Sequence, residues 1–174
     1  MRTFLAGVLF AALALSGLGV AAVEKGWLPA AADRKPGPIE RWAAHHALRA
    51  AIARDSVGLV CPLQPTDANL LAGAHLYAVQ CLVCHGAADG RPSAIARGLN
   101  VSPPQLAKDG VEDDPIPETY WKVKHGIRFT GMPSFGGALR DEQLWQLALF
   151  VGRLDRLPPA VASGWSALPS AVAP

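Results

Sequence analysis

The chain opens with one long apolar segment. Residues 3–23 contain no charged side chain, and charged residues flank them on both sides. A helix of that length reaches about 30 Å at ~1.5 Å per residue, which is enough to cross the hydrocarbon core of a bilayer. A cleaved secretory signal fits the same residues, with an apolar stretch from Phe4 to Leu15 and small residues at positions 20–22. Both interpretations export the rest of the chain, because Arg2 stays on the cytoplasmic side.

Apolar residues at helical spacing recur in later segments of the chain. They predict helices over residues 39–54, 68–83, 118–125 and 141–154. Asp67 is suited to cap the second of these helices, and Pro117 suits the first position of the third. The predicted fold class is therefore all-α.

Two segments lack such a pattern. Residues 86–114 are rich in Gly, Pro and Ser, and a loop of that length is uncommon in a compact domain unless it wraps around something. Residues 161–174 are predicted to be a flexible tail of Ala, Pro and Ser. The chain therefore divides into an anchor or signal segment (1–25), a juxtamembrane helix with a linker (26–64), a folded domain (65–160) and the tail.

The predicted helix over residues 39–54 has a basic face. Arg41, His45 and Arg49 recur at four-residue spacing, and residues four apart lie on the same side of a helix. Such a face fits the surface of an anionic membrane. It fits equally well a spacer helix whose charged side is solvated, and the pattern leaves both interpretations open.

Composition narrows the class of protein. The 174 residues are 51% apolar but only 7% aromatic, with 17 Gly, 15 Pro and a formal net charge of +2. These values exclude a disordered tail protein, a strongly basic nucleic-acid-binding protein and a protein with several membrane spans. So many Gly and Pro residues, with so few large apolar side chains, make a poor core for a small domain. Something else is expected to supply the missing apolar volume.

Two of the three cysteines belong to a motif. Residues 81–85 are Cys-Leu-Val-Cys-His, the C-x-x-C-H signature of c-type haem attachment. In one helical turn the thiols of Cys81 and Cys84 point to the same side and can each add across a haem vinyl group. His85 then brings its imidazole to the iron as an axial ligand. A thioredoxin-like pair would need a βαβ surround and a zinc site would need a second Cys/His pair, and the sequence shows neither.

The third cysteine, Cys61, lies outside the motif. Because both other cysteines are consumed by haem attachment, Cys61 is expected to be a partly buried thiol or a link between two chains.

A second axial ligand is indicated by elimination. Apart from the initiator, the only methionine is Met132, which lies in a loop between a glycine and a proline. A methionine there is a poor core filler and suits a thioether ligand, and His/Met ligation raises the reduction potential of a haem. The rival ligands are His45, His46, His75 and His125, of which His125, close to Met132 in the chain, is the strongest.

With these motifs in view, the sequence resembles the class I c-type cytochromes, specifically bacterial single-haem members with an N-terminal membrane segment. The resemblance rests on residues 73–77, 81–86, 103–106, 120–127, 130–135 and 141–151. It implies three to four helices and long loops around one haem, preceded by a transmembrane helix and a juxtamembrane helix. Where the first and last helices of the domain cross, Gly73 and Tyr77 are expected to face Leu144, Trp145 and Ala148.

The resemblance also implies roles for residues around the haem. A carbonyl of Pro103 or Pro104 is expected to accept the proton of the second ring nitrogen of His85, which fixes the tautomer of that ring. Tyr120 or Trp121 is expected to lie near a haem propionate.

The function implied by the resemblance is electron transfer rather than catalysis. Such a cytochrome carries single electrons between redox partners, for example a dehydrogenase, a quinol-oxidising complex, an oxidase or a reductase, and it binds no nucleic acid. The expected location is the bacterial cytoplasmic membrane with the haem domain in the periplasm, or the soluble periplasm if the N-terminal segment is cleaved. The alternatives are a haem c subunit of a larger oxidoreductase complex, and a haem enzyme or gas sensor with an open sixth site.

Overall fold

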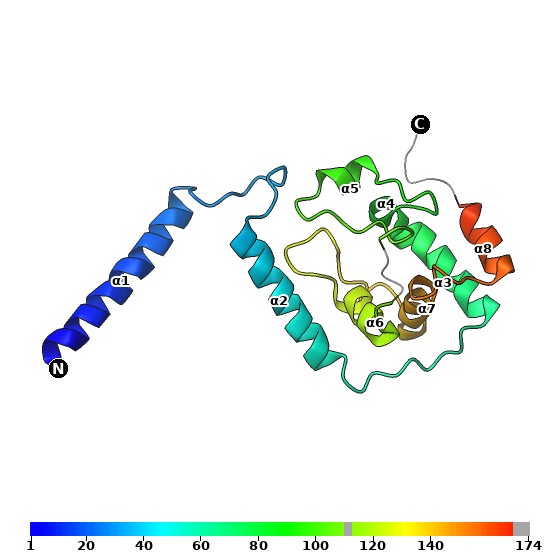
Figure 1. The fold of residues 1–174 in the computed structure, drawn as a ribbon, viewed down its shortest axis with the longest axis horizontal. Coiled ribbons are helices and arrows are strands. Elements are labelled where there is room, and N and C mark those ends of the chain that lie inside the picture. Colours follow the sequence, from blue (N-terminus) through cyan, green and yellow to red (C-terminus); the bar gives the residue numbers. More distant parts are fainter. Residues whose placement is uncertain (110–112, 169–174) are drawn as a thin grey trace. The chain divides into compact units, whose positions relative to one another are not determined.

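The computed structural model describes residues 1–109 and 113–168. In this part of the chain all regular elements are helices, which confirms the predicted all-α class. The chain forms two compact units, residues 1–34 and residues 35–174. Figure 1 shows the order of the helices along the chain.

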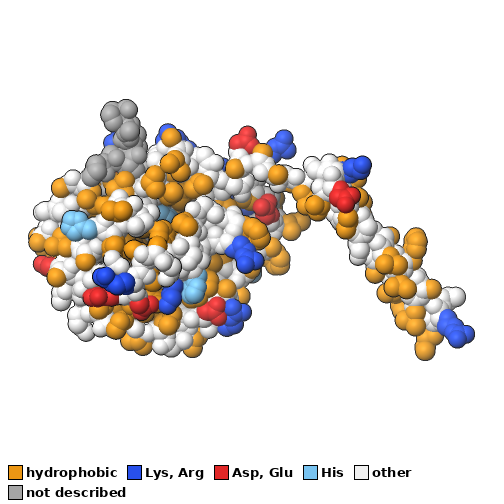
Figure 2. Space-filling model, turned by 180° about the vertical axis from the view of Figure 1, so that it is seen from behind, with side chains coloured by type: hydrophobic (Ala, Val, Ile, Leu, Met, Phe, Trp, Pro, Cys, Tyr) orange, Lys and Arg blue, Asp and Glu red, His pale blue; other side chains and the backbone are white. Residues whose placement is uncertain are grey.

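The first unit contains the helix α1 (Arg2–Glu24). It buries none of its side chains, and Figure 2 shows it covered with hydrophobic groups, with charged groups near its ends. Among the described residues it is the one helix that is long and apolar enough to cross a membrane, and a signal sequence near the N-terminus would have the same length and composition. The apolar segment predicted from the pattern is thus a continuous helix.

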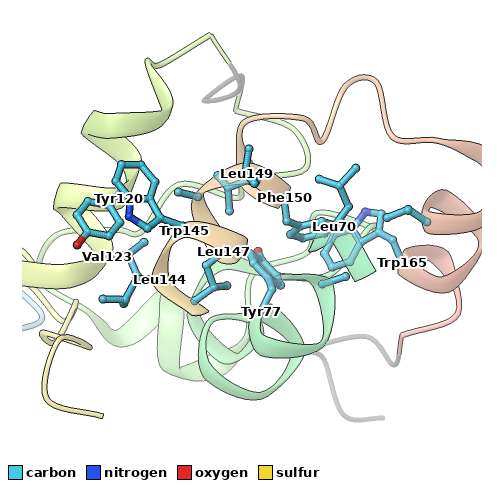
Figure 3. Close-up of a cluster of buried hydrophobic side chains, with 14 of the residues drawn as sticks. Leu70, Tyr77, Tyr120, Val123, Leu144, Trp145, Leu147, Leu149, Phe150 and Trp165 are labelled. Atoms are coloured by element: carbon cyan, nitrogen blue, oxygen red, sulfur yellow. The ribbon is translucent and has the colours of Figure 1, made fainter. Parts of the chain in front are cut away.

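The second unit is a helical domain whose core lies between α3, α6, α7 and α8 (Figure 3). Its helices are α2 (Pro38–Asp55), α3 (Asp67–Gln80), α4 (Leu82–His85), α5 (Ala94–Gly98), α6 (Ile116–His125), α7 (Asp141–Val151) and α8 (Pro159–Ser166).

Two short helices were not predicted. The expected helix over residues 68–83 ends at Gln80, and α4 follows after Cys81. The long loop from residue 86 is interrupted by α5, whose first turn is capped by Ser93 through its hydroxyl and the Ala96 N–H. The N-cap of α3 is Thr66 rather than Asp67, because the Thr66 hydroxyl accepts the Asn69 N–H at 3.3 Å.

The helices α3 and α7 cross at a glycine. A Cβ built on Gly73 would lie 2.2 Å from Gln146 O and 2.7 Å from Phe150 Cβ. The expected crossing of these helices is present, and the atoms nearest to such a Cβ belong to Gln146 and Phe150. Only a residue without a side chain permits this approach.

Gly73→Ala is expected to destabilise the domain by about 1–3 kcal/mol, because the new methyl group overlaps a backbone oxygen that cannot turn away. Thermal unfolding of the haem-loaded protein, followed by its absorbance, measures the effect. The matched control is Gly137→Ala, where a Cβ would have no heavy atom within 4 Å. Equal melting temperatures for the two variants would show that the crossing tolerates a side chain.

The predicted flexible tail is wrong for the residues that the structure describes. Residues 159–166 form α8, in which Val161 is 0% and Trp165 is 6% exposed. The Trp165 ring packs edge-on against Tyr77 and Phe150, with ring centroids 5.1 Å and 5.3 Å apart. Pro159 starts this helix at its first position, and the four-residue spacing of the two apolar side chains places them on one face.

The predicted juxtamembrane helix is α2, and it belongs to the same compact unit as the following domain. It packs against α6 and buries Ile52, while Arg41, His45 and Arg49 are exposed. Just before α2, the Lys35 ammonium donates to Leu99 O at 3.2 Å and to Ser102 Oγ at 3.0 Å. Residues 35–55 therefore contact the rest of the domain.

Candidate haem site

The C-x-x-C-H motif lies at the wall of a cavity of about 280 Å³. The wall is mainly apolar, and it is built from the end of α3, from α4, from the loop before α6, from α6 itself and from the loop that follows it. Six residues that the sequence indicated as haem-site residues line it, namely Cys81, Cys84, His85, Pro103, Pro104 and Met132.

The two cysteines are placed by the break between α3 and α4. Cys81 ends α3 and begins α4, and Cys84 lies in the single turn of α4. Burial, and secondarily the neighbouring Cys84, raises the pKa of the Cys81 thiol to about 12.

No rival metal site is present in residues 1–109 and 113–168, where no group of three or more His, Cys, Asp and Glu side chains could hold a metal ion.

The ring of His85 is fixed by a proline carbonyl. Its Nδ1 lies 2.9 Å from Pro104 O, and because a carbonyl oxygen only accepts, Nδ1 carries the proton. Burial lowers the pKa of this imidazole more than the hydrogen bond raises it. The ring is therefore neutral, and its Nε2 keeps a lone pair for an iron ion. This confirms the expected hydrogen bond and selects Pro104 over Pro103 as its acceptor.

The residue after His85 must be glycine. Gly86 has a φ of +74°, and a Cβ there would lie 2.5 Å from Gln105 Oε1. The buried Tyr77 hydroxyl donates to Gly86 O at 2.8 Å, and the Gln105 amide donates to Cys84 O at 3.1 Å. These contacts tie the motif to α3 on one side and to the proline loop on the other.

A closed turn holds Met132 at the cavity. The Ile127 N–H donates to Met132 O at 3.1 Å, and the Met132 N–H donates to the Thr130 hydroxyl at 3.1 Å. That hydroxyl in turn donates to Ile127 O at 2.7 Å. Gly131 lies so close to Leu99 that a Cβ would be 2.7 Å from its Cδ2. The backbone around Met132 is thus fixed on both sides.

The rival histidines do not line the cavity. His45, His46, His75 and His125 are exposed, and His125 instead pairs with the ring of Trp121 at 5.1 Å. His85 and Met132 are the imidazole and the thioether that reach the cavity wall.

Neither Tyr120 nor Trp121, the residues expected near a haem propionate, lines the cavity. Tyr120 is buried against Trp145, with stacked rings 3.8 Å apart, and its hydroxyl contacts Asp141 and the ammonium of Lys124. The residues of α6 that reach the cavity are Thr119, Lys122 and Val123. Positions three and four apart share a helix face, so residues 120 and 121 point elsewhere.

Sequence analysis missed several residues of the wall. Leu48 of α2 lines the cavity, as do Leu99 and Val101 of the loop after α5. No local signal marks them, because each is an ordinary apolar residue brought in by the tertiary fold. Cys61 does not line the cavity; it is half-buried, with its Sγ 3.5 Å from Leu63 O.

The donor set fits haem c. Two thiols three residues apart, one neutral imidazole and one thioether share a mainly apolar cavity of about 280 Å³. The thiols would form the covalent links, and nitrogen and sulfur are the axial ligands found in cytochromes c. The helices and this cavity therefore define a c-type haem protein.

Comparison with known protein families gives the same class. The family model described as "Cytochrome C oxidase, cbb3-type, subunit III" matches residues 68–151, which include both motif cysteines, His85 and Met132. This stretch is a c-type cytochrome domain, with covalently bound haem c and a role in electron transfer. No solved structure matches the chain significantly.

Proposed function

We propose that the protein carries single electrons through one haem c, attached by Cys81 and Cys84 and ligated by His85 and Met132. The observation that carries this proposal is the meeting of these four side chains in one apolar cavity. With both axial positions filled, the site favours outer-sphere electron transfer over substrate chemistry at iron.

The haem, when bound, supplies the change between ferric and ferrous iron. The protein contributes rigid ligands and a dry surround. Pro104 keeps the proton of His85 on Nδ1, and the Thr130 turn keeps the Met132 backbone in place. Because a thioether favours ferrous iron and an apolar wall disfavours extra positive charge, both features raise the reduction potential.

The proposed location is the periplasmic side of a bacterial cytoplasmic membrane, with α1 as the anchor. Support comes from the apolar length of α1 and from its place near the N-terminus. If α1 is a signal, the mature chain begins near residue 23. N-terminal sequencing of the mature protein distinguishes the two.

The proposed partners are a dehydrogenase or quinol-oxidising complex as donor and an oxidase or reductase as acceptor. A second candidate is a haem c subunit within an oxidase complex, which the match to the family of cbb3-type oxidase subunit III favours. Mild detergent extraction of membranes, followed by identification of the proteins that travel with the haem, tests both. A stable oxidase assembly supports the subunit role, and a cytochrome that elutes alone supports the separate carrier.

The absorbance spectrum of the ferric protein tests the function itself. We expect the ferric protein to give a low-spin spectrum with the weak long-wavelength band typical of methionine ligation. We expect the spectrum of the reduced protein to stay unchanged when carbon monoxide is added. A high-spin spectrum that shifts at once with added cyanide would overturn the carrier and support a haem enzyme or gas sensor with an open sixth site.

A further inference from the structure

An ion pair lies in the wall of the cavity. Among the described residues that line it, Asp114 and Lys122 are those of the types Asp, Glu, Lys and Arg. A further ammonium, that of Lys35, does not line the cavity but donates to two residues that do, Leu99 and Ser102. The Lys122 ammonium lies 2.6 Å from Asp114 Oδ2. Their side chains are 24% and 37% exposed, so the pair is partly removed from solvent.

Local structure explains why the pair forms. Lys122 lies on the face of α6 that also presents Thr119 and Val123 to the cavity. Asp114 immediately precedes Pro115, the N-cap of α6. Side chains of a helix lean toward its N-terminus, so the long Lys122 chain runs back along the cavity wall to reach the carboxylate.

Charges in such a wall act on electron transfer. Reduction adds one negative charge at the iron, so a nearby ammonium favours the reduced form and a nearby carboxylate favours the oxidised form. These interactions are stronger beside an apolar, partly buried cavity than in water. Because the two charges are 2.6 Å apart, each masks most of the effect of the other.

We propose that Lys122 and Asp114 act in opposite directions on the reduction potential of the haem, with Lys122 raising it and Asp114 lowering it, so that the intact pair keeps the two effects in balance. The proposal rests on the proposed haem in this cavity and goes beyond the axial ligands. The surface charges of α6 do not share the role. Lys124, two residues further, forms its ion pair with Asp141 outside the cavity wall.

The test is a redox titration of the haem-loaded, full-length protein and of two neutral variants. Lys122→Gln leaves the carboxylate unpaired and is expected to lower the potential, and Asp114→Asn leaves the ammonium unpaired and is expected to raise it. The expected size is at least a threefold change in the ratio of reduced to oxidised protein at fixed ambient potential. A threefold change corresponds to a shift of about 28 mV in the reduction potential, because a tenfold change in a one-electron equilibrium corresponds to 59 mV. The double variant is expected to return close to the parent.

The opposite signs separate an electrostatic role from a structural one. If the pair only holds the fold together, both variants break the same contact and their potentials move together or not at all, which would overturn the proposal. Lys124→Gln is the control of equal charge change on the same helix, and it is expected to shift the potential by less than half as much. A shift as large as that of Lys122→Gln would show that the net charge of the protein, and not the place of the charge in the cavity wall, changes the potential.

The ferric spectrum separates a failure of this proposal from a failure of the proposed function. With the low-spin, methionine-type spectrum intact in all variants, the potentials report on the ion pair alone. If the unmodified protein itself lacks that spectrum, the proposed ligand set is contradicted instead.

Discussion

Replacing Met132 by alanine is expected to open the sixth coordination position of the haem iron. The thioether that favours ferrous iron is lost, so the reduction potential should fall by at least about 59 mV, a tenfold change in a one-electron equilibrium. The ferric protein should also lose its long-wavelength methionine band, and the reduced protein should bind carbon monoxide. Redox titration and absorbance with and without carbon monoxide measure these changes.

The matched control for this prediction is His125→Ala. His125 is close to Met132 in the chain, but it is exposed and does not line the cavity. Its removal is expected to leave both spectrum and potential unchanged. If His125→Ala opens the site while Met132→Ala does not, the sixth ligand is the histidine and the haem site rearranges on binding.

Trp165→Ala is expected to destabilise the domain by about 3–5 kcal/mol, the usual cost of removing a large buried aromatic side chain. Trp165 is 6% exposed and makes edge contacts with Tyr77 and Phe150, at the centre of the α3–α7 core. The melting temperature of the haem-loaded protein should fall by more than about 6 °C. Calorimetry or thermal melting of the haem absorbance measures it.

Trp42→Ala is the control for the loss of a tryptophan. Trp42 lies on α2 and is 62% exposed, so its removal should change the free energy of unfolding by no more than about 0.5 kcal/mol. If the melting temperatures of Trp165→Ala and Trp42→Ala are equal, α8 does not contribute to the core in solution. The flexible tail predicted from the sequence would then be correct.

The pattern of apolar residues predicted the longer helices well because their signals are local. The start and end of α2, α6 and α7 depend on prolines, acidic first turns and spacing that can be read within a few residues. The same reasoning failed for α8. Its sequence is rich in Ala and Ser, and the buried side chains of Val161 and Trp165 pack it against the core of the domain. Short helices are stabilised by tertiary packing rather than by propensity.

The candidate site divides in the same way. A short motif predicts Cys81, Cys84 and His85, because covalent attachment and ligation require those residue types at fixed spacing. Met132 was predicted as the second axial ligand by elimination, because the chain contains no other internal methionine. The resemblance implied that Tyr120 or Trp121 lies near a haem propionate, and the residues of α6 that line the cavity are Thr119, Lys122 and Val123. Which face of a helix meets the cavity depends on how the helix packs, and its limits do not reveal it.

The sequence by itself determined the apolar N-terminal helix, the all-α class and the haem-binding chemistry. Each of these follows from residue type and short-range spacing. Only the tertiary structure decided that Pro104 rather than Pro103 holds His85, that α2 brings Leu48 to the cavity, and that Asp114 meets Lys122 in its wall. These contacts join residues from different elements. Their geometry depends on how the helices pack, which no local pattern records.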